Sequence, residues 1–207
     1  MESFYQNYSH NIRPEVKIAD VRKEIPIPEK VDLIVTSPPY GDSRTTVAYG
    51  QFSRLSLQWL DMDGKEEIKN IDKISLGGIP VEELNFETNS ETLNNILKKL
   101  KEKDENRAKD VCSFYLDLEK CLLNLSNVMN KGGYMCFVVG NRTVKEIRMP
   151  TDDILVELAE RMRLDYIKTI IRNIPSKRMP LKTSPTNIKG KVGETISKES
   201  IVILRKN

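Results

Sequence analysis

Two short runs of apolar residues restrict the fold of this chain more than any other feature. Residues 31–36, VDLIVT, and 134–140, YMCFVVG, are apolar at nearly every position and do not alternate with polar residues. Such runs are typical of parallel strands that are covered on both faces. Between them lies an apolar stripe at helical spacing, which ends at the glycines of residues 130–133. The order strand, helix, strand predicts an α/β fold.

Further segments extend this pattern at both ends of the chain. Residues 16–20, VKIAD, predict an earlier strand, and residues 166–171 and 200–204 predict two strands that close the chain. Residues 61–110 are dense in mixed charge, and we interpret them as an insertion packed beside a single domain that covers residues 1–207. Three more helices are expected: one carrying Phe52, Leu55 and Trp59, one carrying Leu93, Ile96, Leu97 and Leu100, and one with Thr151 as its N-cap.

The bulk composition is that of a folded globular protein. The chain has 207 residues, of which 39% are hydrophobic and 30% charged, which is enough apolar material for a core. It contains no apolar run of the length that spans a membrane, and its first residues lack the pattern of a signal peptide. We therefore expect a cytoplasmic protein. The net charge of +3 is too small to identify a partner.

The cysteines do not form a recognisable metal or redox motif. Cys112, Cys121 and Cys136 show no Cys-x-x-Cys spacing, and His10 is the sole histidine. A zinc site of cysteine and histidine ligands is hard to build from this set. We therefore predict reduced thiols in the core and no metal.

The residues that follow the strand at 31–36 are the strongest indication of chemistry. Ser37, Pro38, Pro39 and Tyr40 lie at the carboxyl end of that strand, which is where ligands bind in open α/β sheets. Each proline fixes its own φ angle and restricts the residue before it, so the loop is stiff. A structural interpretation is also open, in which the two prolines merely end the strand and Tyr40 covers an edge.

The sequence TSPPY, together with the strand before it, resembles the catalytic loop of the DNA amino-methyltransferases. That family carries Ser, Asp or Asn before Pro-Pro-Tyr or Pro-Pro-Phe. The resemblance implies a Rossmann-like methyltransferase sheet, mostly parallel with a C-terminal antiparallel hairpin, and S-adenosylmethionine as cofactor. The form that begins with Ser is typical of enzymes that methylate N4 of cytosine in DNA. Methylation of N6 of adenine, of an RNA base or of a protein amide stays open, as does a non-catalytic DNA-binding subunit.

The resemblance also implies roles for individual residues. The Ser37 hydroxyl and the Pro38 carbonyl would accept the two amino hydrogens of the target base, and Tyr40 would stack on that base after it is flipped out of the duplex. Ser37 would also border the cofactor. Asp20 matches the family's acidic residue near the cofactor adenine, although an Asp at a strand end is often only a turn residue. Gly140 and Asn141 could line the pocket or form a simple turn.

A basic segment precedes the last expected strand. Seven lysines and arginines, and no acidic residue, lie between Lys168 and Lys191. Such a run can be a solvated loop, but contacts to phosphates supply most of the affinity for DNA that does not depend on sequence. We predict that the residues of this segment that clamp the DNA backbone are Lys177, Arg178, Lys182 and Lys189, with Arg44 and Arg54 as weaker candidates.

Part of the family's pattern is absent from this sequence. The glycine-rich loop after the family's first strand, and the acidic residue after its second, have no counterpart here. The resemblance covers roughly residues 16–206, from the family's third strand to its last, so the first two strands are lacking. The strand at 31–36 would then have an exposed apolar edge. We therefore predict a split enzyme, a heterodimer in which a different polypeptide supplies that loop. A truncated piece of a longer protein would have the same sequence.

Overall fold

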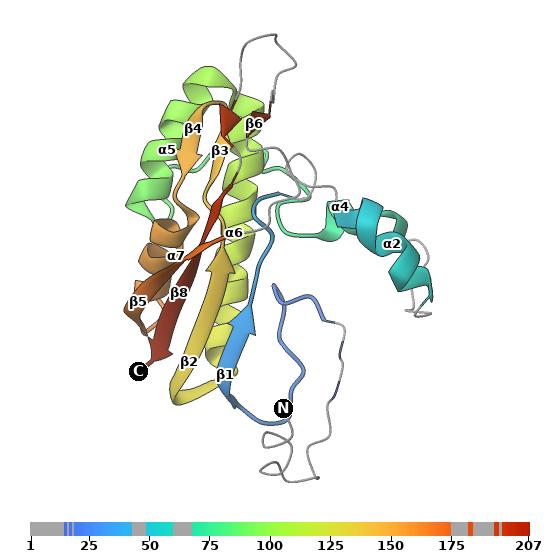
Figure 1. Ribbon diagram of the computed structural model, residues 1–207, viewed down its shortest axis with the longest axis vertical. Helices are drawn as coiled ribbons and strands as arrows, with labels where there is room; N and C mark the ends of the chain where they lie inside the picture. Colours follow the sequence, from blue (N-terminus) through green and yellow to red (C-terminus); the bar gives the residue numbers. More distant parts are fainter. Residues whose placement is uncertain are drawn as a thin grey trace.

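The main sheet has four strands. The computed structural model describes residues 15, 17, 19–42, 49–59, 68–174, 182–183, 193–194 and 196–207. Strands β1 (Val31–Thr36), β2 (Met129–Val139), β8 (Lys198–Lys206) and β5 (Leu164–Asn173) lie side by side in that order (Figure 1). β1 and β2 are parallel, and β8 is antiparallel to both β2 and β5. This confirms the predicted α/β class with a C-terminal antiparallel pair, in which β8 alone runs against the other strands.

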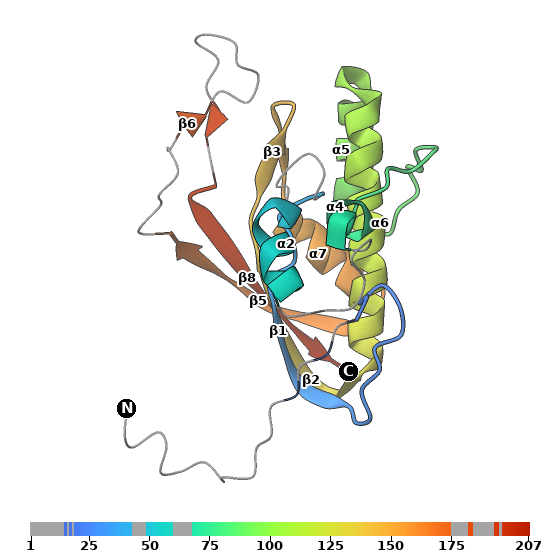
Figure 2. The same ribbon diagram turned by 90° about the vertical axis from the view of Figure 1, so that its right-hand side faces the viewer.

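Three helices cover one face of this sheet. Figure 2 shows α5 (Glu91–Lys103), α6 (Glu105–Asn127) and α7 (Thr151–Glu160) on the same side of the strands. The parallel strands β1 and β2 are joined through α6, as a βαβ unit requires. The remaining elements are short or peripheral: α2 (Tyr49–Trp59), α4 (Ile71–Ile74), the hairpin of β3 (Arg142–Val144) with β4 (Ile147–Met149), and the pair β6 (Lys182–Thr183) and β7 (Gly193–Glu194).

The core lies between these helices and the sheet. Phe137 on β2 and Leu204 on β8 are at most 1% exposed, and they pack in one cluster with Phe114 and Leu118 of α6. Each such side chain stabilises the fold by roughly 1.5–3 kcal/mol. The expected apolar stripe of α5 is fully in this cluster. α5 therefore belongs to the main core, although it falls in the segment that was expected to be an insertion.

The starts of the helices are held by polar contacts that also join the helices to one another. The Ser90 hydroxyl accepts from the Leu93 amide at 3.0 Å and donates to Glu157 of α7 at 2.6 Å. α7 differs from the expectation, because Pro150 is its N-cap and Thr151 is its first residue. The Thr151 hydroxyl does not cap the helix because it pairs with the buried Tyr115 hydroxyl at 3.0 Å.

The other face of the sheet is apolar but uncovered by any helix that the structure describes. Leu33 and Val35 of β1 are 59% and 66% exposed. The register places Val35 opposite Cys136, and Cys136 opposite Ile203, so these alternate residues share one face. Asp165, Lys168 and Arg205 add charged side chains to it. We call the surface formed by Leu33, Val35, Tyr134, Cys136, Val138, Ile170, Ile201 and Ile203 the open face.

The strand predicted at residues 16–20 does not form at its described positions. Lys17, Ala19 and Asp20 are irregular, while residues 16 and 18 lie outside the described part of the chain. The Asp20 carboxylate accepts from the Arg22 amide at 3.1 Å, and the Lys23 amide donates to the Asp20 carbonyl at 2.8 Å. These bonds close a turn where the prediction placed the end of a strand, because an Asp side chain can satisfy nearby backbone donors.

Two of the cysteines are buried as core thiols. Cys112 and Cys121 lie on the buried side of α6, whereas Cys136 is half-buried on the open face. Burial raises the pKa of the Cys121 thiol to about 11, so it stays protonated near neutral pH. Within the described ranges, no helix combines the length and the apolar character needed to cross a membrane.

Candidate active site

The Ser-Pro-Pro-Tyr loop leaves the sheet directly at the carboxyl end of β1. Ser37 is exposed, and its hydroxyl donates to the Val138 carbonyl of the neighbouring strand at 3.1 Å. This bond fixes the direction of the hydroxyl hydrogen, so the lone pairs of the oxygen remain available to accept hydrogen bonds. The loop can therefore present an acceptor to a ligand at this end of the sheet.

Tyr40 is held at two points. Its hydroxyl donates to Glu199 Oε1 at 2.5 Å. Its ring lies against Gly140, where a Cβ atom would stand only 2.8 Å from Tyr40 Cδ2. Burial, and after it the bond to Glu199, raise the pKa of Tyr40 to about 12, so the phenol remains a donor at any physiological pH.

Glu199 links Tyr40 to a third strand. It is the second residue of β8 and lies opposite Arg172 of β5, whose Nε donates to Glu199 Oε2 at 3.0 Å. A second guanidinium nitrogen of Arg172 binds the same oxygen. The hydrogen bond from Tyr40 and the ion pair with Arg172 outweigh the effect of burial and lower the pKa of Glu199. We call Tyr40, Glu199 and Arg172 the tyrosine triad.

A buried ionic cluster anchors the far end of the loop. Asp42 is completely buried, with its Oδ2 3.3 Å from an Arg142 nitrogen and 3.6 Å from an Arg107 nitrogen. Gly41 has φ of 147°, and a Cβ atom there would lie 2.1 Å from the Arg142 guanidinium. Only glycine fits under this side chain. The Ser-Pro-Pro-Tyr loop is thus fixed at Ser37 and again at Asp42.

The loop after β2 is fixed in a similar way. The Asn141 side chain donates to Asp152 Oδ1 at 2.8 Å, and the Ser200 hydroxyl donates to Asp152 Oδ2 at 2.6 Å. Gly140 and Asn141 therefore form a rigid turn that supports the Tyr40 ring. The Asn141 side chain is engaged by Asp152, and a pocket-lining role for this segment stays a prediction.

The predicted cofactor residue Asp20 is occupied by a local ion pair. Both of its oxygens accept from the Arg22 guanidinium at 2.9 Å, and Arg22 also reaches Asp117 at 3.1 Å. The hydrogen bond from Arg22 lowers the pKa of Asp20, so the carboxylate is ionised at neutral pH. Its role toward a cofactor stays a prediction.

Most of the predicted DNA contacts lie outside the described residues. Arg44, Lys177, Arg178 and Lys189 belong to this group, and of Lys182 only the backbone is described, in β6. The pairing of Asn173 with Lys198 shows that the basic segment leaves and re-enters the sheet at the end that carries Ser37. Arg54 of α2 is described, and it pairs with Asp72 at 3.3 Å.

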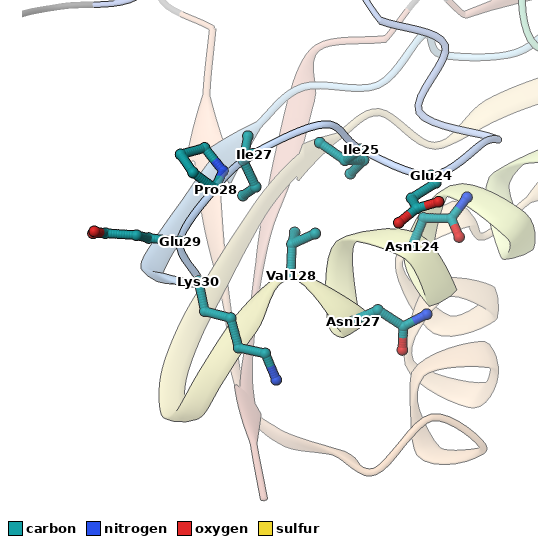
Figure 3. Close-up of a pocket in the computed structure, with 9 residues that line it drawn as sticks. All are labelled: Glu24, Ile25, Ile27, Pro28, Glu29, Lys30, Asn124, Asn127 and Val128. Carbon is teal, nitrogen blue, oxygen red and sulfur yellow. The ribbon is translucent and has the colours of Figure 1, made fainter.

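A hollow on the surface lies at the opposite end of β1. It has a volume of about 480 Å³ and borders the start of β1 and the end of α6 (Figure 3). None of its lining residues belongs to the Ser-Pro-Pro-Tyr loop or the tyrosine triad. Its lining residues are Glu24, Ile25, Ile27, Pro28, Glu29, Lys30, Asn124, Asn127 and Val128.

The residues that hold the Ser-Pro-Pro-Tyr loop were not predicted from the sequence. Glu199 lies 159 residues from Tyr40 and Arg142 lies 100 residues from Asp42. A single acidic residue directly before the apolar run of β8 is the only sign of Glu199 in the sequence. Glu199 can be recognised as a partner of Tyr40 only when the strand order, which places β8 beside β2, is known.

Comparison with known proteins gives one strong sequence match. No model of a known protein family matches the chain. Over 202 residues the chain is 43% identical to the Type II methyltransferase M.MvaI of Kocuria varians, in an alignment that covers 94% of this chain. By sequence, this chain is a relative of that methyltransferase. It spans 44% of the relative's length, so it corresponds to less than half of that protein.

The solved structures that resemble this chain have much lower sequence identity to it. Two crystal structures of TTHA0409 from Thermus thermophilus, a protein assigned as a DNA modification methylase, are 17% and 19% identical to the chain. They match 87% and 91% of this chain and 47% and 52% of TTHA0409, with TM-scores of 0.38 and 0.44. Both scores fall below 0.5, so these likenesses support no further conclusion about the chain.

Proposed function

We propose that this chain is the catalytic part of a DNA methyltransferase that methylates the N4 amino group of cytosine. The observation that carries the proposal is the exposed Ser37 hydroxyl, which is oriented by Val138 and lies three residues before an anchored Tyr40. The sequence match to a Type II methyltransferase supports it. S-adenosylmethionine is the methyl donor of such enzymes and supplies an electrophilic methyl group on a sulfonium.

The loop would act by changing the geometry of the target amine. The lone pair of an aryl amine is delocalised into the ring, so the nitrogen is a poor nucleophile. If the Ser37 hydroxyl and the Pro38 carbonyl accept the two amino hydrogens, the nitrogen is drawn toward a tetrahedral form and its lone pair is localised. Holding the amine in line with the methyl group then contributes an effective molarity on the order of 10⁵ M or more.

The target base would have to leave the duplex to reach this loop. Its amino group is inaccessible inside the helix, and extrusion costs a few kcal/mol. Stacking on Tyr40 would offset this by roughly 1–3 kcal/mol. The basic segment leaves the sheet at the same end, and we infer that its lysines and arginines would neutralise phosphates beside the extruded base.

The described residues that could border the methyl donor are already engaged by other side chains. The spaces beside Gly41 and Gly140 are filled by Arg142 and by Tyr40, and the carboxylate of Asp20 is engaged by Arg22. We therefore infer that a second polypeptide carries the glycine-rich cofactor loop. Support comes from the apolar open face. Among the described strands, none pairs with the outer edge of β1.

The experiment is a methyl-transfer assay of the chain copurified with its neighbouring gene product. Digestion of the methylated DNA should give N4-methylcytosine, whereas N6-methyladenine would support the adenine alternative. Ser37→Ala should lower the rate on the order of 10²-fold, by analogy with the loss of one active-site hydrogen-bonding group. Ser56→Ala, a change of another exposed serine on α2, is the matched control and should leave the rate unchanged.

Two further outcomes decide between the alternatives. DNA binding without methyl transfer in the assembled protein would contradict the enzymatic proposal and favour a DNA-binding subunit. Tight binding of S-adenosylmethionine by this chain alone would contradict the split site. If the missing segment is part of the same polypeptide, a longer chain should be active without any partner.

A further inference from the structure

We propose that Glu199 is a positioning residue for Tyr40, and that Arg172 holds Glu199 in place for this purpose. The carboxylate would set the angle of the aromatic ring on which the extruded base stacks. This inference rests on the proposed function, because it assigns a role only if Tyr40 faces a base. It concerns two residues that no feature of the catalytic loop itself identifies.

The geometry leaves the Tyr40 ring little freedom. The orientation of a tyrosine ring depends on two rotatable bonds. Here the hydroxyl and one edge of the ring are both restrained. The hydroxyl is bound to Glu199 Oε1 at 2.5 Å, and the edge that carries Cδ2 and Cε2 lies against Gly140. A ring that is held in advance pays less entropy when a base stacks on it.

Burying the Glu199 carboxylate costs free energy, and this cost supports a functional role for its contact with Tyr40. Glu199 is 9% exposed, and a buried carboxylate is unfavourable unless it is paired and hydrogen-bonded. Arg172 meets this need through the register of β5 and β8, which sets the two residues directly opposite each other. One carboxylate oxygen serves Arg172, and the other is left to accept from Tyr40.

The position of the tyrosine triad also fits a role toward a ligand. Glu199 alternates along β8 with Ile201 and Ile203, so it lies on the same side of the sheet as the open face. Along β1, Ser37 continues the alternation of Leu33 and Val35 and emerges on that side too. The anchored ring and the oriented hydroxyl therefore border one surface.

The hydrogen bond has a chemical consequence as well as a steric one. A phenol that donates to a carboxylate gains electron density in its ring. The base acquires positive charge as its amine nitrogen bonds to the methyl carbon and the carbon–sulfur bond of the sulfonium breaks. Until the extra proton is released to solvent, an electron-rich ring face attracts this cation. Loss of the Glu199 charge should therefore slow the chemical step more than it weakens DNA binding.

The test is a double-mutant cycle in the assembled, active enzyme. We expect Glu199→Gln to lower kcat about tenfold while the KM for DNA changes less than about twofold. In a Tyr40→Phe background, the same change should lower kcat less than about twofold, because its effect passes through the hydroxyl that Phe lacks. Arg172→Lys, which keeps a cation, should be milder than Arg172→Gln.

The controls separate this inference from the proposed function. Glu160→Gln, an exposed glutamate at the end of α7, should leave kcat unchanged. An inactive wild-type assembly would overturn the proposed function itself. With an active wild type, Glu199→Gln at full rate, or with an equal cost in both backgrounds, would overturn the positioning role alone. Because Gln has nearly the shape of Glu, circular dichroism should show a folded variant, and a variant that unfolds is replaced in the cycle by Arg172→Gln.

Discussion

Both faces of the sheet carry apolar side chains, but their environments are opposite. On the face beneath α5, α6 and α7, Met135 and Phe137 of β2 are at most 1% exposed. On the open face, Leu33 and Val35 of β1 are more than half exposed. A sheet face that meets water usually carries polar side chains. The comparison teaches that both faces carry apolar side chains suited to burial, and that the described residues cover only one face.

The candidate site lies where the open face meets the carboxyl ends of the strands. Ser37 and Glu199 both point to that side, whereas the buried anchor of Asp42 and Arg142 reaches toward the helices. A polypeptide that covered the open face would border the site as well. This arrangement supports our proposal that the second polypeptide completes both the core and the cofactor site.

The largest loss of stability should come from a mutation on the face that α5, α6 and α7 cover. Phe137→Ala removes a fully buried ring and should lower the free energy of unfolding by about 3–5 kcal/mol, because the cavity adds to the lost burial. Urea denaturation of the isolated chain measures this loss. Leu33→Ala on the open face is the matched control and should cost less than about 1 kcal/mol. Equal costs at both positions would show that the open face is covered within this chain.

Mutation of Asp42, which anchors the Ser-Pro-Pro-Tyr loop, should lower the free energy of unfolding almost as much. Asp42→Asn removes the carboxylate beside the buried Arg142 and should cost roughly 3 kcal/mol, because the buried guanidinium loses this ion pair. Thermal and urea unfolding measure the change. Glu146→Gln, which alters the exposed pair with Lys103, should cost between about 0 and 1 kcal/mol. A small effect at Asp42 would mean that the loop end is not held by this cluster.

A charged substitution on the open face should weaken binding of the second polypeptide while leaving the stability of the isolated chain nearly unchanged. Val35→Asp should change the stability of the isolated chain by less than about 1 kcal/mol, since the side chain already meets solvent. It should weaken binding of the second polypeptide at least about tenfold, or roughly 1.4 kcal/mol. Isothermal titration measures the affinity. Leu123→Asp places the same charge on an exposed leucine of α6 and should leave the affinity unchanged. Unaltered binding by the Val35 variant would remove the open face from the interface.

The smallest expected effect is on the pH dependence of stability, and it involves Glu157 of α7. Burial alone would raise the pKa of Glu157, but hydrogen bonds from Ser90 and Thr92 outweigh it and lower the pKa. A carboxylate with a lowered folded pKa stabilises the protein fully above its unfolded pKa, and this contribution is lost as pH falls through the folded value. Stability should therefore decline below the ordinary value of 4.5, and less steeply in Glu157→Gln. Urea midpoints measured from about pH 6 to about pH 3 test this, and identical profiles would exclude the assignment.

Local patterns predicted the elements that have their own signals. The apolar runs of β1 and β2 and the stripes of α5 and α6 are visible in the sequence because burial repeats with the period of each element. The prediction at residues 16–20 failed because a turn closed by Asp20 and Arg22 competes with the strand. The helix at Phe52 forms as predicted, yet its apolar stripe is exposed, since periodicity identifies a face and not what covers it.

The sequence alone determined the α/β class and the Ser-Pro-Pro-Tyr loop at the end of a strand, because apolar periodicity and proline stiffness act between neighbouring residues. Only the tertiary structure decided what holds that loop. Glu199 meets Tyr40, and Arg142 meets Asp42, because the order β1, β2, β8, β5 and the β3–β4 hairpin bring distant segments together. The tertiary structure also decided which face of the sheet is left open, since coverage depends on which side the connecting helices pack.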